Sequence, residues 1–210
     1  MKVIKETCYK GTRILLGNEK AEYLQKCREY LKNLQFTEIQ IPIIQLAETF
    51  KDKVGEENNN MMYNFTDRGN RELCLAPEYT AAIQKLATTT FKHEKDVKLF
   101  YIAECFRGEK PQAGRYRQFT QLGVEILNPS QEYILHRDAI LLCSLWINNY
   151  KLYHLNPITS RGLDYYKDGK GFEINCPQLG SSKQVCGGGE YEGGIGFAIG
   201  IDRLMEINKL

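Results

Sequence analysis

The chain has 210 residues, of which 28 are basic and 26 acidic, so its formal net charge is only +2. This length is enough for one substantial core, and so small a charge gives no net field that would favour polyanion binding, so any contact with nucleic acid must be local. No run approaches the roughly 20 apolar residues of a membrane span, and the first residues lack the apolar centre of a signal peptide. We therefore expect one domain in the cytoplasm, without membrane contact.

Seven cysteines are scattered along the chain, and no two have the two-residue spacing that is typical of a zinc site. An odd number without such spacing indicates reduced side chains in the core. We therefore expect no metal site made of protein side chains.

The first part of the chain predicts a helix followed by a strand. Apolar residues recur at helical spacing over residues 19–35, with Asn18 in the position of an N-cap. After the helix, isoleucines alternate with Gln40 and Pro42 over residues 39–43, which is a strand pattern. Because proline removes a backbone donor, this strand is expected near an exposed edge.

A hairpin and a second helix follow. Residues 61–65 and 72–75 are short strand candidates, and the tetrad of residues 67–70, Asp-Arg-Gly-Asn, forms turns readily. Residues 79–89 have a helical pattern. Two long strands are then predicted over residues 97–106 and 116–127.

The last part of the chain predicts two more helices and one more hairpin. Residues 132–150 are apolar enough for a largely buried helix, and residues 197–209 also have a helical pattern. Within residues 163–175, the pair Asp168-Gly169 is a hairpin signal. Strands that come as hairpins and ribbons between helices indicate an α+β fold with an antiparallel β-sheet flanked by helices.

The two long strands have polar side chains on one face. Alternation places Arg107 and Glu109 in line with the odd-numbered face of the first strand. The odd-numbered face of the second strand contains Arg115, Arg117, Phe119, Gln121 and Glu125. The opposite face is apolar, with Leu122, Val124 and Ile126. A sheet with such a face is a poor core but suits a charged ligand.

The sequence of this ribbon resembles motif 2 of the class II aminoacyl-tRNA synthetases, in the form found in the histidyl-tRNA synthetase family. The resemblance rests on Phe106-Arg107-x-Glu109 and on residues 114–125. Five further segments resemble parts of that family. They are residues 10–13 and 41–42 (an N-terminal segment and the motif 1 dimer edge), 161–166 (Arg-Gly-Leu-Asp-Tyr-Tyr), 187–193 (glycine-rich) and 196–204 (motif 3, a strand that enters a helix).

The resemblance implies a class II catalytic core that uses ATP and Mg²⁺ to convert histidine into histidyl-adenylate. Two anions react in this step, so the site needs fixed positive charge. It does not need a general base. The residues implied in catalysis are Arg107, Arg161 and Arg203. Those implied in ATP binding are Arg107, Glu109, Arg115, Phe119 and Arg203.

The resemblance also implies the residues that bind histidine: Glu78, Thr80, Gln121, Glu125, Tyr165, Tyr166 and Tyr191. Glu125 is the apt group for the imidazole. A carboxylate that accepts a hydrogen bond from an imidazole N–H selects a side chain that other amino acids do not mimic, because a wrong one leaves the buried charge unpaired.

Some positions depart from the family pattern. Ala76 replaces the usual arginine before Pro-Glu, and Tyr79 replaces a glycine. Glu190 stands where the glycine-rich segment normally has arginine, so we expect a reversed charge close to bound phosphate. The stretch between Glu125 and Arg161 is too short for the family's insertion domain, and the sequence stops soon after motif 3. We therefore expect a single catalytic domain over residues 1–210, without an anticodon-binding domain.

Three functions remain open at this point. The first is a minimal histidyl-tRNA synthetase that works as a homodimer and recognises the acceptor end of tRNA(His), with Gln112 in the contacting loop, or that needs a partner protein in trans. The second is a non-catalytic histidine sensor, like the regulatory subunit of ATP phosphoribosyltransferase. The third is a ligase that passes the activated amino acid to an acceptor other than tRNA.

Overall fold

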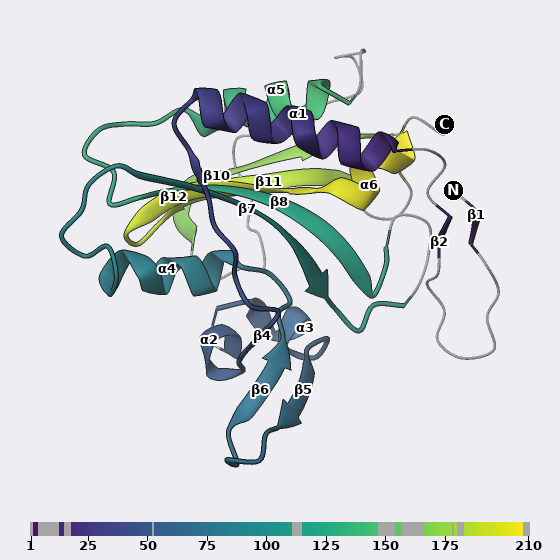
Figure 1. Cartoon of the computed structure of the whole chain (residues 1–210), viewed down its shortest axis with the longest axis vertical. Coiled ribbons are helices and arrows are strands. Elements are labelled where there is room, and N and C mark those ends of the chain that lie inside the picture. Colours follow the sequence, from purple (N-terminus) through teal and green to yellow (C-terminus); the bar gives the residue numbers. More distant parts are fainter. Residues whose placement is uncertain are drawn as a thin grey trace.

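The computed structural model describes residues 2–3, 13–14, 18–51, 53–110, 115–146, 154–156, 166–177, 179 and 183–207. Within these ranges the strands form three sheets (Figure 1). The smallest pairs β1 (Lys2–Val3) with β2 (Arg13–Ile14). The second has the order β4-β6-β5, and the largest has seven strands in the order β3-β7-β8-β12-β11-β10-β9.

The seven-stranded sheet contains the two long strands predicted from the sequence. Its strands, in spatial order, are β3 (Thr37–Glu38), β7 (Val97–Phe106), β8 (Gln118–Leu127), β12 (Gly194–Gly200), β11 (Gln184–Tyr191), β10 (Tyr166–Asn175) and β9 (His154–Asn156). All neighbours are antiparallel except β3 and β7, which are parallel. The predicted α+β class with an antiparallel sheet flanked by helices is confirmed.

Helices cover both faces of this sheet (Figure 1). On one face lie α1 (Glu19–Asn33), α5 (Leu135–Ser144) and α6 (Ile201–Ile207). On the other lies α4 (Thr80–Thr88), and beyond it the small sheet with two short helices. These elements are β4 (Ile44–Leu46), α2 (Glu48–Lys51), α3 (Gly55–Asn59), β5 (Tyr63–Thr66) and β6 (Glu72–Leu75). In the described part of the chain, no helix has the length and apolar content needed to cross a membrane.

Alternation along β7 and β8 divides the core in two. Even-numbered residues such as Phe100 and Val124 are buried against α1 and α5, in one apolar cluster. Odd-numbered residues such as Tyr101 and Leu127 belong to the other cluster, together with α4. The predicted division of the ribbon into two faces is therefore confirmed.

Three predicted elements agree with the structure, apart from their caps and ends. The helix expected over residues 19–35 is α1, although the Asn18 side chain makes no capping hydrogen bond. The hairpin expected from residues 61–75 is the antiparallel pair of β5 and β6. The helix expected over residues 79–89 is α4.

The strand predicted over residues 39–43 was wrong. The edge strand after α1 is β3, which begins earlier and pairs with β7, and the chain re-enters a sheet only at β4. Between them the backbone makes isolated bonds: Ile39 N donates to Phe100 O at 2.8 Å, and Ala76 N donates to Ile43 O at 2.9 Å. Pro42 has no N–H, so a continuous ladder is interrupted there.

The hairpin predicted at Asp168-Gly169 was also wrong. Strand β10 runs through this pair, and its register with β11 shifts between Tyr166 and Gly171. A two-residue Asp-Gly hairpin needs positive φ at both central residues. Here only Gly169 has one, at 69°, so the chain forms a bulge and continues.

Both C-terminal helices are shorter than predicted. The helix expected over residues 197–209 begins at Ile201, because Phe197 and its neighbours pair with both β8 and β11 in the centre of the sheet. The order expected for motif 3, a strand that enters a helix, is confirmed. The helix expected over residues 132–150 is α5, and it is buried on one face only, because Leu141 and Leu145 are exposed.

The two adjacent leucines of α5 test this burial. Leu142 is fully buried, whereas Leu141 is 43% exposed. We expect Leu142→Ala to lower the free energy of unfolding by about 2–5 kcal/mol, because it removes buried methyl groups and leaves a cavity. Leu141→Ala makes the same change in helix propensity and should lower it by less than about 1 kcal/mol. Urea unfolding followed by circular dichroism measures both, and equal losses would contradict the assigned orientation of α5.

Candidate functional site

The centre of the site is Glu125, on the odd-numbered face of β8. Its side chain is completely buried. Thr80, at the start of α4, donates its hydroxyl to Oε1 at 3.0 Å, and the Tyr191 hydroxyl of β11 donates to Oε2 at 2.8 Å. Three elements that are far apart in sequence therefore meet at one carboxyl group.

Two glycines make room for this arrangement. A Cβ added to Gly196 would lie 1.6 Å from Oε2 of Glu125, which is its cross-strand neighbour. A Cβ added to Gly123 would lie 2.1 Å from the ring of Tyr101. Any other residue at these positions would collide with the side chains that form the site.

Burial raises the pKa of Glu125 from its ordinary value to about 8. The hydrogen bonds from Tyr191 and Thr80 oppose this rise, and the nearby carboxylate of Glu78 adds to it. Desolvation outweighs the two donors, so the group carries a proton over part of the neutral range. A buried carboxyl group poised in this way is typical of a site that binds a polar ligand.

Glu78 was expected to bind histidine, and it also has a structural role. Its Oε2 accepts from Thr80 N at 2.7 Å and its Oε1 accepts from Ala81 N at 3.0 Å, so the carboxylate caps the first turn of α4. Each oxygen has a second lone pair, and a carboxylate at a helix N-terminus is stabilised by the helix dipole. Glu78 and Thr80 are thereby fixed beside Glu125.

The alternation of the predicted strand places Tyr101 and Cys105 on this face, but the sequence analysis assigned neither to the site. The Tyr101 hydroxyl is buried and has no hydrogen-bond partner among the residues that the structure describes. Cys105 Sγ lies 3.1 Å from Oε1 of Gln121 and donates to it. Both follow from the alternation of β7, which places them on the same face as Arg107, so the signal was present.

The arginines gather at the far end of the same face. The guanidinium of Arg107 lies over the ring of Phe119, 5.3 Å from its centre, and its Nε donates to Pro77 O at 2.9 Å. On α6, Arg203 donates to Gln184 O at 2.9 Å. Glu109 and Arg115 form an ion pair at 3.7 Å.

The electrostatics of Arg203 indicate how close these groups are. Burial, together with the nearby charges of Arg115 and Arg107, lowers its pKa to about 10, although Glu109 acts in the opposite direction. The guanidinium still carries its proton near neutral pH. The structure therefore brings together all five residues that were expected to bind ATP.

Of the remaining predicted residues, Tyr166 lies beside Tyr191, with 6.5 Å between the ring centres. Gln121 lies on β8 between Phe119 and Glu125. Three predicted residues, Gln112, Arg161 and Tyr165, lie outside the described residues.

The expectation that Glu190 would lie close to bound phosphate was wrong. Its carboxylate lies 3.5 Å from Lys170 Nζ and 3.9 Å from Lys167 Nζ. In the register of the sheet, Glu190 is opposite Ile195 of β12, which is opposite Ile126 of β8, which is opposite Lys98 of β7. Lys98 precedes Arg107 by nine residues on the same strand and its extension. Nine residues of strand span about 30 Å, so Glu190 is at the opposite end of the sheet from Arg107.

Known proteins resemble this chain in both sequence and structure. The family model described as histidyl-tRNA synthetase matches residues 17–136. The histidine–tRNA ligase of Desulfitobacterium hafniense is 28% identical over 315 aligned positions, which cover 96% of this chain and 73% of the relative. Because 315 positions exceed the 210 residues here, the relative contains internal residues without a counterpart in this chain.

Two solved structures share the fold. The apo histidyl-tRNA synthetase of S. aureus superimposes with a TM-score of 0.72 at 24% identity, covering 98% of this chain and 70% of that one. An ATP phosphoribosyltransferase regulatory subunit/histidyl-tRNA synthetase from Bacillus halodurans gives a TM-score of 0.69 at 16% identity, covering 93% and 81%.

An antiparallel sheet with arginines at one end of a polar face, and a strand that enters an arginine-bearing helix, define a class II aminoacyl-tRNA synthetase core. The family match covers more than half of the chain. The chain belongs to the histidyl-tRNA synthetase family.

The raised pKa of Glu125 predicts how stability depends on pH. Between about pH 5 and pH 8 the folded state holds a proton that the unfolded state has lost, so the free energy of unfolding falls as the pH rises through this window. Glu125→Gln removes the titration. We expect the free energy of unfolding of this variant, minus that of the wild type, to increase between pH 5 and pH 8.5 by roughly a few kcal/mol. Urea midpoints at both pH values measure it, and an unchanged difference would contradict the shift.

Proposed function

We propose that this chain joins histidine and ATP into histidyl-adenylate and transfers the histidyl group to tRNA(His). The observation that carries the proposal is the buried Glu125 carboxyl group, held by Thr80 and Tyr191, on the same face as Arg107, whose charge in turn acts on Arg203 of α6. One end of this face suits an imidazole and the other a polyphosphate. Family membership supports the same substrates.

The Glu125 end supports selection of histidine. An imidazole N–H can donate to Glu125, which Tyr191 holds in place, and the neighbouring Tyr166 offers a hydroxyl group for the other ring nitrogen. Glu78, Thr80 and Gln121 provide oxygens suited to the ammonium group of the amino acid. An apolar side chain in this place would leave Glu125 buried without its partner, which disfavours binding strongly.

The arginine end supports activation by ATP. A carboxylate oxygen of histidine attacks the α-phosphorus, the bond from that phosphorus to the bridging oxygen breaks, and pyrophosphate leaves. Arg107 would hold the α-phosphate with its forked guanidinium and Arg203 the γ-phosphate, while Phe119 stacks on adenine. Arg161 is proposed to add positive charge at the same phosphate. These charges stabilise the transferring phosphoryl group.

Magnesium fits this site as a companion of ATP. Mg²⁺ in such sites is bound mainly by phosphates and water, with one or two protein carboxylates. The described residues contain no group of three metal-binding side chains, and Glu109 is the carboxylate close to Arg203 and Arg115. When bound, the ion would neutralise phosphate charge, and Glu109 would hold it there.

A second function is supported by the likeness to the regulatory subunit/synthetase structure from Bacillus halodurans. Such a chain would bind histidine as a sensor without activating it. The retention of Arg107, Arg161 and Arg203 favours catalysis, because a sensor needs no such set. A third candidate is a ligase that uses the adenylate on another acceptor, and transfer assays separate it from the first.

We also propose that the chain forms a homodimer through the small sheet. Several apolar side chains around β4 and β5 are exposed: Ile43, Ile44, Leu46 and Phe65. Ile44 and Leu46 line a mainly apolar groove between β4 and α4, together with Ile41, Leu73 and Leu86 among others. A contiguous apolar surface of this kind is typical of a protein interface, and Ile41-Pro42 resembles the dimer edge of the family.

Histidine-dependent exchange of labelled pyrophosphate into ATP, followed by transfer to tRNA, tests the activity. We expect exchange with the wild type and none above background with Glu125→Ala, while ATP binding changes little because Glu125 lies away from Arg107 and Phe119. Glu72→Ala, which removes an exposed carboxylate paired with Lys51, serves as the control and should keep full exchange.

The outcomes separate the three functions. Exchange with transfer supports a synthetase, exchange without transfer supports another acceptor, and histidine binding without exchange supports a sensor. Undiminished exchange by Glu125→Ala would refute the assignment of the imidazole site.

The interface is tested by the oligomeric state. We expect the wild type to run as a dimer in size-exclusion chromatography with light scattering, and Ile44→Asp to run as a monomer, because a charge would be buried at the interface. Leu141→Asp places the same charge on a similarly exposed leucine of α5 and should leave the dimer intact. A wild type that is monomeric at micromolar concentration would exclude this interface.

A further inference from the structure

The short helix α6 contains Arg203, and its position needs explanation. It has seven residues and directly follows β12. An isolated helix of this length is not stable in water, so its place depends on contacts with the rest of the chain. Ile201, Leu204 and Ile207 pack into the core, but apolar contacts are not directional and leave the register of the helix undefined.

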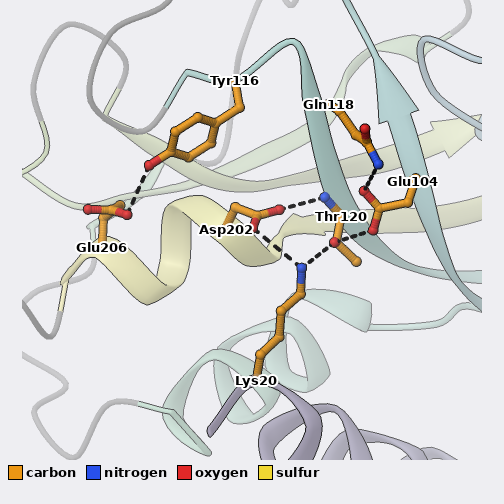
Figure 2. A network of polar contacts seen from close by, with 7 residues as sticks. All are labelled: Lys20, Glu104, Tyr116, Gln118, Thr120, Asp202 and Glu206. Carbon is orange, nitrogen blue, oxygen red and sulfur yellow. Dashed lines mark hydrogen bonds and ion pairs between the residues drawn. The ribbon is translucent and has the colours of Figure 1, made fainter. Parts of the chain in front are cut away.

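Two carboxylates on α6 supply directional contacts (Figure 2). Asp202 Oδ2 accepts the backbone N–H of Thr120 at 2.6 Å, and Glu206 Oε1 accepts the hydroxyl of Tyr116 at 3.0 Å. Residues four apart on a helix lie on the same face. The two contacts therefore fasten one face of α6 to β8 and to the segment that leads into it.

Each of these contacts is next in sequence to a residue proposed to bind ATP. Asp202 precedes Arg203, Tyr116 follows Arg115, and Thr120 follows Phe119. Because neighbours on a strand point to opposite faces, Thr120 is held from behind the sheet while Phe119 faces the ligand.

The contact at Asp202 is part of a buried polar network (Figure 2). Asp202 and Thr120 are each 3% exposed. Lys20 Nζ, from α1, lies 3.4 Å from Asp202 Oδ1 and donates to Thr120 Oγ1 at 2.5 Å. That hydroxyl in turn donates to Glu104 Oε1 on β7 at 2.5 Å. Buried charges of this kind are costly unless paired, and a satisfied network favours one arrangement of the elements that it joins.

Helix α6 needs directional contacts because its Arg203 lies close to two other arginines. Arg107 and Arg115 both act on Arg203 electrostatically, and like charges repel until a polyanion lies between them. A helix held only by apolar contacts could move away to relieve this repulsion.

We propose that Asp202 and Glu206 are positioning residues, which hold α6 in register with β8 and so fix Arg203 relative to Arg115 and Phe119 before ATP binds. The proposal rests on the proposed function of this face. Neither carboxylate touches the substrates, and each acts through the arginine that α6 carries. Removing a contact should therefore weaken the binding of ATP and leave that of histidine unchanged.

Tyr116→Phe is the most conservative test, because it removes only the hydroxyl that Glu206 accepts. We expect kcat/KM for ATP in pyrophosphate exchange to fall about tenfold, in line with the loss of one hydrogen bond to a charged group, with KM for histidine within twofold of the wild type. Glu206→Met, which keeps the length of the side chain but removes the acceptor, should act similarly. The double variant should be no worse than either single one, because both remove the same contact.

A matched control separates positioning from stability. Tyr30 on α1 donates its hydroxyl to Asp138 on α5 at 2.8 Å, which is the same chemistry without a link to the arginines. Tyr30→Phe should lower the melting temperature to about the same extent as Tyr116→Phe and leave kcat/KM for ATP unchanged.

A second pair of variants tests the network at Asp202. Lys20→Met should lower kcat/KM for ATP, and Lys20→Arg should restore part of it.

Calorimetric titration with Mg²⁺-ATP alone keeps this test independent of catalysis. If the wild type binds ATP but shows no exchange, the proposed function fails, and a weaker binding of ATP by Tyr116→Phe than by Tyr30→Phe still supports positioning. Equal effects of the two variants, a matching loss for histidine, additive losses in the double variant, or a wild type that binds no ATP would each overturn it.

Discussion

The continuous pairing of β7 with β8 is the constraint on which the rest of the structure depends. The two strands stay in register from Val97 opposite Leu127 to Phe106 opposite Gln118, without a bulge. This fixes which side chains enter the core below α1 and α5 and which face α4. A slip of one residue would turn Glu125 into the apolar layer and Val124 toward the ligand. Both halves of the core and the proposed site therefore depend on a single register.

The polar face manages charge differently at its two ends. Around Glu125 a carboxyl group is buried with neutral donors, so its charge depends on what binds there. Around Arg107 and Arg203 the charge is permanent, and Glu109 offsets part of it. An amino acid with an N–H donor at one end and a polyphosphate at the other would suit both ends at once.

Much of this arrangement could be predicted from sequence, because alternation in two long strands is a strong local signal. The faces of residues 97–106 and 118–127 follow from period two, and the motif resemblance then relates them to ATP and histidine. The bulge at Gly169 could not be predicted, because the same dipeptide also forms hairpins. Likewise, the contacts of Asp202 and Glu206 join residues some 80–90 positions apart, and their pairing depends on how α6 packs. Glu190 was misplaced because sequence order alone does not say which end of a sheet a residue occupies.

Helix α4 connects the Glu125 site to the exposed apolar groove. Its first turn is held by Glu78 and donates to Glu125 through Thr80, while Ala82, Ile83 and Leu86 line the exposed apolar groove. The nine residues of α4 span about 13 Å. The groove and the hydrogen bond from Thr80 to Glu125 therefore share one short helix. A partner that covers the groove would contact the same helix that holds Thr80 beside the Glu125 carboxyl group.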